Sequence, residues 1–181
     1  MYGSTMGTET QSRIELPADV EQVLDDLLTA EVSTVGKDGT PITWPVVVQY
    51  RRESADFLLC TSIGMPGKIF NLRRSPKISL SYTDPTGSGL VNPPKVLVQG
   101  TAELDSEVRT SVDGVEDFWV NKVMGPQPAS KMMSSNPLMR WYMDVYYMRI
   151  YITVTPTRIC WWPSGDYSEA MQSIEVNSYV G

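Results

Sequence analysis

Apolar and polar residues alternate with a period of two along most of the chain, a pattern typical of strands with one buried face. It predicts strands at 31–36, 42–51, 57–62, 77–83, 96–104 and 145–163. Apolar residues spaced three or four positions apart instead predict short helices at 17–28 and 67–74. The second is too short to be stable by itself, so we expect Ile69, Phe70 and Leu72 to pack against the rest of the protein. Asp38 and Gly39 favour a tight turn, so the first two strands should form a hairpin. Gly100 predicts a bulge within the strand 96–104.

The order of these elements predicts a mainly β protein, an antiparallel six-stranded β-barrel with inserted helices. A parallel doubly wound sheet would need a helix after nearly every strand, and that pattern is absent. The longest apolar runs have the length of strands, well short of the roughly 20 residues that span a bilayer. We therefore expect no membrane segment.

The 181 residues, 41% of them hydrophobic, suit one domain with a core of its own. Residues 1–13 are polar and aperiodic and predict a flexible arm, followed by the main domain at 14–165 and a tail at 166–181. Within the domain, 105–144 carries helical spacing and no clear strand signal, which predicts a helical insertion. Its methionine and aromatic content suits either an apolar lid over a pocket or a packing element.

The composition excludes several classes of function. Fifteen basic against 21 acidic residues give a net charge of −6, so we do not expect nucleic acid as a partner. The chain has no histidine, which removes histidine-based nucleophile pairs, zinc sites and general bases. Cys60 and Cys160 are expected to be buried reduced thiols. With no histidine and only two cysteines, we expect no metal site. The N-terminal residues lack the pattern of a secretory signal, so we expect a cytoplasmic protein.

The clearest candidate chemistry lies between 57 and 82. Thr61 and Ser62 end a predicted strand, a turn containing Gly64 and Gly67 follows, and Lys68 begins a short helix. Hydroxyl groups, backbone N–H groups, a helix N-terminus and a cation together suit a bound phosphate. On spacing alone, the favoured alternative is an ordinary strand–turn–helix with a solvated lysine.

Pro45 interrupts a predicted strand. Because proline cannot donate a ladder hydrogen bond, this point should be an edge, a bulge or a place where a ligand lies against the strand. An edge strand without a ligand is the alternative.

Three segments, DGTPITWPVVV (38–48), TSIGMPGKIFNLRRSPKISLSY (61–82) and VLVQGTAEL (96–104), resemble the flavin-binding split-barrel family. This family includes pyridoxamine-phosphate oxidase-like proteins and flavin/deazaflavin oxidoreductases. VTPTRICWW (154–162) is similar to its last barrel strand. The resemblance implies an FMN-binding split barrel, a homodimer with cofactor sites at the interface and a small-molecule substrate.

The resemblance also implies roles for the matching positions. The residues implied to bind the cofactor are Thr61, Ser62 and Lys68 at the ribityl phosphate, Thr43, Trp44, Pro45 and Val46 along the isoalloxazine ring, and Gln99 or Trp161 with Trp162 from the barrel wall or the partner subunit. A core role for the two tryptophans is an equally good interpretation.

Two departures from the family pattern narrow the expected activity. Pro66 stands where many relatives have a second basic residue, so the phosphate site is either weaker or recruits Arg73 or Arg74. Without histidine, and with the ending IEVNSYVG, the chain lacks the substrate motif of pyridoxamine-phosphate oxidase itself.

The leading hypothesis is an FMN-dependent oxidoreductase that passes a hydride between a reduced nicotinamide and a small organic acceptor. The first alternative is a deazaflavin-dependent reductase of the same fold, whose longer anionic tail would need further cations such as Arg51, Arg52, Arg73 and Arg74. The second is a non-catalytic flavin or haem-type carrier or sensor. No catalytic residue is assigned; the candidates by position at strand ends are Tyr82, Asp144 and Tyr147.

Overall fold

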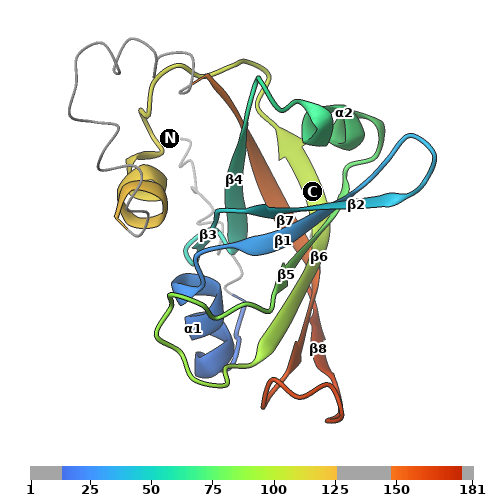
Figure 1. The fold of residues 1–181 in the computed structure, drawn as a ribbon, viewed down its shortest axis with the longest axis vertical. Helices are drawn as coiled ribbons and strands as arrows, with labels where there is room; N and C mark the ends of the chain where they lie inside the picture. Colours follow the sequence, from blue (N-terminus) through green and yellow to red (C-terminus); the bar gives the residue numbers. More distant parts are fainter. Residues whose placement is uncertain (1–13, 126–147, 177–181) are drawn as a thin grey trace, which may run out of the picture.

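The computed structural model describes residues 14–125 and 148–176, which form one eight-stranded antiparallel sheet. The strand order is β2-β1-β5-β6-β7-β4-β3, and β8 pairs with β7 beside this path. The sheet curls until β1, β2 and β3 run across the direction of β4 and β7, which makes a half-barrel (Figure 1). Its strands are β1 (Ala30–Val35), β2 (Pro41–Val46), β3 (Val48–Arg51), β4 (Asp56–Ser62), β5 (Lys77–Tyr82), β6 (Lys95–Leu104), β7 (Arg149–Trp162) and β8 (Gln172–Glu175). The described helices are α1 (Ala18–Asp26), α2 (Gly67–Arg74) and the π-helix η1 (Phe118–Met124).

The predicted fold class is confirmed, but the sheet has eight strands where six were predicted. One reason is β8, which forms from the predicted tail and pairs with the second half of β7. The other is that the predicted strand 42–51 is divided at Val47 into β2 and β3. Strand β1 begins at Ala30, opposite Val46, so the chain beyond Val46 has no partner on β1 and pairs with β4 instead. The division places β2 and β3 at the two ends of the strand order.

The hairpin between β1 and β2 forms as predicted. Its turn needs Gly39, whose φ of 86° lies in the left-handed region. Pro45 lies on β2, an edge strand, where a residue without an N–H is tolerated.

Helix α1 closes one end of the half-barrel, and α2 lies at the other end (Figure 1). Val20, Val23 and Leu24 of α1 are completely buried, and the helix contacts β3 and β6. In α2, Ile69 and Leu72 are buried as expected, but Phe70 is 53% exposed. The prediction that Phe70 packs under the helix was wrong, because a short helix on a sheet buries only one face.

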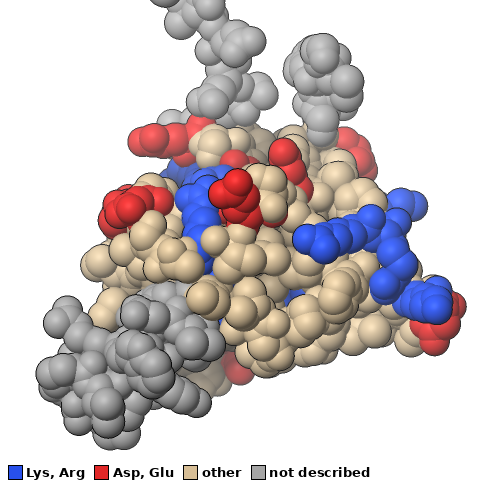
Figure 2. Space-filling view, turned by 90° about the horizontal axis from the view of Figure 1, so that it is seen from above, with Lys and Arg blue, Asp and Glu red and all other residues tan. Residues whose placement is uncertain are grey.

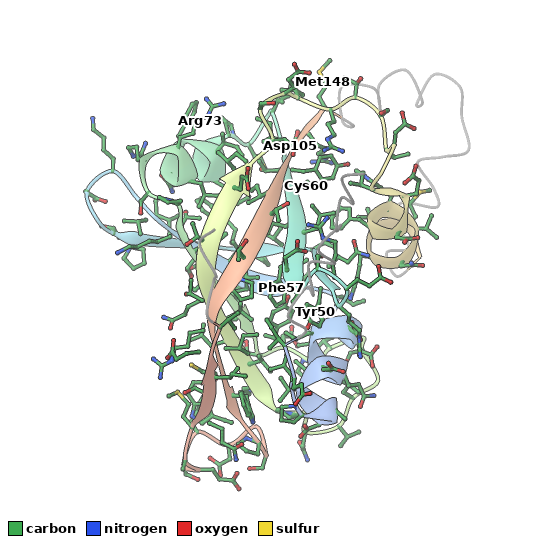
Figure 3. The ribbon with its side chains drawn as sticks, turned by 180° about the vertical axis from the view of Figure 1, so that it is seen from behind. Tyr50, Phe57, Cys60, Arg73, Asp105 and Met148 are labelled. Atoms are coloured by element: carbon green, nitrogen blue, oxygen red, sulfur yellow. The ribbon has the colours of Figure 1, made fainter. Side chains whose placement is uncertain are left out.

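The main core fills the concave side of the sheet. Phe57 on β4 lies at its centre, with ring centroids 5.0 Å from Tyr50 and 6.5 Å from Tyr82 (Figure 3). A second, smaller cluster lies on the other face of β4 and β7 and joins the sheet to the insertion. Its buried members are Leu58, Val115, Phe118, Trp119 and Tyr151.

The predicted bulge in β6 is confirmed, since the register with β7 shifts between Gln99 and Gly100. A Cβ atom at Gly100 would lie 2.4 Å from the backbone oxygen of Thr155, closer than real contacts allow. We expect Gly100→Ala to lower the free energy of unfolding by about 1–3 kcal/mol, the usual effect of overpacking. Urea unfolding of the variant measures this.

The matched control is Gly64→Ala. A Cβ atom at Gly64 would lie 3.7 Å from the Ser62 Oγ, which is an ordinary contact. The control should stay within about 0.5 kcal/mol of the wild type. Equal losses in both variants would contradict the close approach at Gly100.

Cys60 and Cys160 are both free thiols, as expected, but only Cys160 is buried, because Cys60 is partly exposed. No helix in the described ranges is both long and apolar enough to cross a membrane. The whole predicted N-terminal arm, 1–13, and residues 126–144 of the insertion lie outside the described residues.

Candidate cofactor site

The candidate site begins where β4 ends and the chain turns into α2. Thr61 is buried, and its Oγ1 donates a hydrogen bond to the carbonyl of Met65 (3.1 Å). The Ser62 Oγ accepts a hydrogen bond from the N–H of Gly64 (3.3 Å). The Thr61 proton is therefore used inside the turn, whereas the Ser62 hydroxyl donates to none of the residues that the structure describes and can donate to a ligand.

Lys68 lies in the first turn of α2 and is only 7% exposed. Its Nζ lies 4.8 Å from the centre of the Trp44 ring, a cation–π contact. Burial lowers the pKa of Lys68, and the Cys60 thiol opposes this shift. Within residues 14–125 and 148–176, no carboxylate lies at ion-pair distance from Lys68. An anionic ligand at this position would compensate its buried charge.

A pocket of about 240 Å³ lies between the end of β4, α2 and η1. Five of the predicted site residues line it, namely Pro45, Val46, Thr61, Ser62 and Lys68. The structure adds further lining residues, which are Val47, Cys60, Met65, Phe118, Trp119, Val123 and Arg149. Phe118 and Trp119 of the insertion pack on the sheet and also form a wall of the pocket.

Four predicted site residues do not line this pocket. Trp44 contacts Lys68 but is not among the lining residues, and Thr43 is exposed, with its hydroxyl hydrogen-bonded to that of Ser33 (2.7 Å). The Gln99 side chain is exposed on β6. Trp161 is 9% exposed and belongs to the main core, which favours the core interpretation for this tryptophan.

Sequence reasoning missed the polar residues that β7 and the insertion bring to the pocket. Trp119 donates a hydrogen bond from Nε1 to the Tyr151 hydroxyl (2.7 Å), and the Arg149 guanidinium lies 5.8 Å from the Trp119 ring centre. Burial raises the pKa of the Cys60 thiol to about 11, while the charges of Arg149 and Lys68 oppose the shift. Alternation along 145–163 already placed Arg149 and Tyr151 on one side of a strand, but nothing in the sequence indicated which strand they would join.

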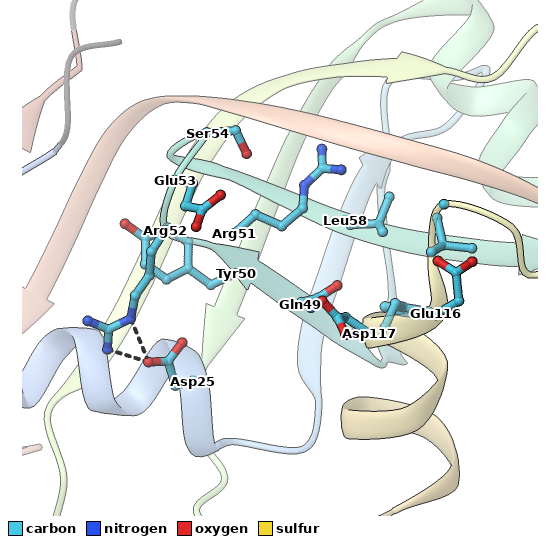
Figure 4. A pocket seen from close by; sticks show the side chains of 13 residues that line it. Asp25, Gln49, Tyr50, Arg51, Arg52, Glu53, Ser54, Leu58, Glu116 and Asp117 are labelled. Carbon is cyan, nitrogen blue, oxygen red and sulfur yellow. Dashed lines mark hydrogen bonds and ion pairs between the residues drawn. The ribbon is translucent and has the colours of Figure 1, made fainter. Parts of the chain in front are cut away.

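A larger pocket, of about 600 Å³, lies between α1, the β3–β4 hairpin and the start of the insertion (Figure 4). Its two arginines are paired with acids. Arg51 forms an ion pair with Asp56 (2.6 Å), and Arg52 forms ion pairs with Glu21 and Asp25 of α1. The suggestion that Arg51 and Arg52 hold an anionic cofactor tail is therefore not supported, because their charges are already compensated.

Arg73 and Arg74 are exposed in the last turn of α2 and do not line the 240 Å³ pocket. Figure 3 shows Arg73 well apart from Cys60, which marks that pocket. Figure 2 shows Lys and Arg side chains gathered on the side of the molecule where α2 and the β1–β2 hairpin lie. These cations can meet only the part of a ligand that extends beyond the pocket.

The candidates for proton transfer gain no support. Tyr82 is 1% exposed in the main core, and burial raises its pKa far above the usual range. It does not line the 240 Å³ pocket. Asp144 and Tyr147 lie outside the described residues.

No family model matches this sequence, and no curated protein matches it. Solved structures do match it. An F420 reductase is 21% identical, and the match covers 80% of this chain and 98% of that protein with a TM-score of 0.55. A pyridoxamine 5'-phosphate oxidase-related, FMN-binding protein from Nostoc punctiforme is 10% identical, with 91% and 100% covered and a TM-score of 0.52.

A heme-binding protein from Mycobacterium smegmatis is 19% identical, with a TM-score of 0.53. The match covers 90% of this chain but 60% of that protein. At such identities a likeness shows the fold. The resemblance found in the sequence is confirmed at this level: the chain has the split-barrel fold that these FMN-binding, F420 reductase and heme-binding proteins share.

Proposed function

We propose that this protein is a flavin-dependent oxidoreductase that binds FMN in the 240 Å³ pocket and acts on a small organic acceptor. One observation carries the proposal. The pocket collects a buried lysine without a carboxylate partner among the described residues, a serine hydroxyl with a free proton, and the first turn of a helix. The split-barrel fold, which includes an FMN-binding protein, supports it.

The donor groups of the pocket fit a phosphate monoester. The Lys68 ammonium supplies a positive charge, and Ser62 supplies an O–H donor. The backbone N–H groups in the first turn of α2 are further donors, and they lie at the positive end of the helix dipole. Pro45 and Val46 line the same pocket and are the residues proposed to lie along the ring. Bound FMN would supply the two-electron redox chemistry, and these residues would bind and orient it.

We further propose that the site is completed by a second copy of the chain. A volume of 240 Å³ lies below the roughly 300–1,000 Å³ of a typical small-molecule site, so one chain encloses only part of the cofactor. Apolar side chains are exposed beside the pocket, with Ile63 at 40% and Met65 at 64%. Exposed apolar surface of this kind is typical of an interface.

A deazaflavin in place of FMN is the second candidate, and the likeness to an F420 reductase favours it. Its longer anionic tail would extend from the pocket towards the exposed Arg73 and Arg74. A carrier or sensor without catalysis is the third candidate, in line with the likeness to a heme-binding protein.

Native mass spectrometry of the purified protein, followed by denaturation and absorbance of the released ligand, separates these candidates. We expect a dimer that carries two FMN molecules and whose flavin is bleached by a reduced nicotinamide under nitrogen. A colourless protein that takes up deazaflavin and not FMN would support the second candidate. Tight flavin or haem binding with no reduction by either nicotinamide would overturn the enzymatic proposal.

A further inference from the structure

A second buried cation lies in the same pocket as Lys68. Arg149 begins β7, is 8% exposed and lines the pocket. It lies directly opposite Ser62 in the β4–β7 register. Opposite residues of an antiparallel pair present their side chains on the same face, with Cβ atoms about 4.5–5.5 Å apart. The Arg149 side chain therefore starts beside the hydroxyl that keeps its proton for a ligand.

Neighbouring segments hold the backbone of Arg149, and an aromatic ring lies beside its side chain. Its backbone exchanges two hydrogen bonds with Arg109, at 3.0 Å and 2.8 Å, in addition to the pairing with β4. Its guanidinium lies 5.8 Å from the ring centre of Trp119, and that ring is held by the hydrogen bond to Tyr151. A guanidinium against an aromatic ring keeps N–H groups along its edge, in the fork geometry that matches phosphate oxygens.

The two cations act on the same small volume. The charges of Arg149 and Lys68 both oppose the rise that burial causes in the pKa of Cys60, which lies between Leu59 and Thr61 on the pocket wall. Two positively charged side chains on one pocket favour a ligand that carries nearly two negative charges.

We propose that Arg149 is a second binding residue for the cofactor, and that Arg149 and Lys68 together hold one phosphate group with Ser62 between them. This inference rests on the proposed function. The second cation of the site then comes from β7, a strand that the sequence did not connect with the phosphate.

The test compares FMN with riboflavin, which has the same ring and no phosphate. Dissociation constants for both are measured by fluorescence titration of the apoprotein of the wild type, Arg149→Gln and Lys68→Met. We expect Arg149→Gln to weaken FMN binding by about tenfold or more, the effect of losing a charge-assisted hydrogen bond. Riboflavin binding should change by less than about twofold. The matched control, Arg158→Gln, removes an arginine of the same strand that is paired with Glu175 (3.0 Å) and does not line the pocket.

Equal weakening of FMN and riboflavin, or an unchanged FMN affinity in folded Arg149→Gln, would overturn the inference. If Lys68→Met still discriminates against FMN in that case, the proposed function stands without Arg149. If the wild type binds neither flavin, the proposed function fails as well. Should Arg149→Gln not fold, Arg149→Lys keeps the charge and loses the fork, and the ratio of FMN to riboflavin affinity should fall about threefold or more. An unchanged ratio in Arg149→Lys would then overturn the inference.

Discussion

Replacement of Lys68 by methionine is expected to weaken FMN binding by about 1.5–3 kcal/mol, the contribution of a hydrogen bond to a charged group. This corresponds to a rise in Kd of about 10- to 150-fold. Methionine keeps an unbranched apolar stem beside Trp44 and removes only the ammonium, so the fold of α2 should survive. Fluorescence titration of the apoproteins with FMN measures the change.

The matched control is Lys77→Met. Lys77 is exposed at the start of β5 and does not line the pocket, so its loss should leave the Kd of FMN within about twofold of the wild type. Circular dichroism confirms that both variants are folded. An unchanged Kd in folded Lys68→Met would remove Lys68 from the site and, with it, the assignment of a phosphate to the first turn of α2.

Features that depend on a few neighbouring residues could be predicted from the sequence. The Asp38-Gly39 turn, the short helix after the glycine-rich turn and the bulge at Gly100 all follow from local backbone preferences, and the structure contains all three. The same local signals placed Thr61, Ser62 and Lys68 near one another, and they do line one pocket.

Features set by distant partners could not be predicted in this way. The division of 42–51 at Val47 depends on where β1 begins, and alternation is the same on both sides of the break. Strand β8 is short and largely exposed, so it carries no apolar signal and depends on pairing with β7.

The composition of the site shows the same limit. Arg149 joins Ser62 only because β7 pairs with β4 in one register, and a shift by one residue would turn Arg149 to the other face. The sequence therefore identified the half of the pocket that comes from β2 and from the segment between β4 and α2. The half that comes from β7 and the insertion required the structure.

Replacement of Phe57 by alanine is expected to lower the free energy of unfolding by about 3–5 kcal/mol, the usual loss for a buried phenylalanine. Phe57 is completely buried, and it lies opposite Tyr50 on β3 and Val154 on β7. The side chain thus joins strands on both sides of β4, and its removal leaves a cavity beside the tilted Tyr82 ring. Urea unfolding followed by circular dichroism measures the loss.

The control is Phe70→Ala, the same substitution at a side chain that is 53% exposed on α2. Because little area is removed from the core, the change should stay within about 0.5 kcal/mol. Unfolding of a dimer depends on protein concentration. A loss of stability in Phe70→Ala that changes with protein concentration would therefore mark Phe70 as a contact between subunits. Losses of equal size at Phe57 and Phe70, independent of concentration, would contradict the arrangement in which the concave face of the sheet holds the core and the outer face of α2 does not.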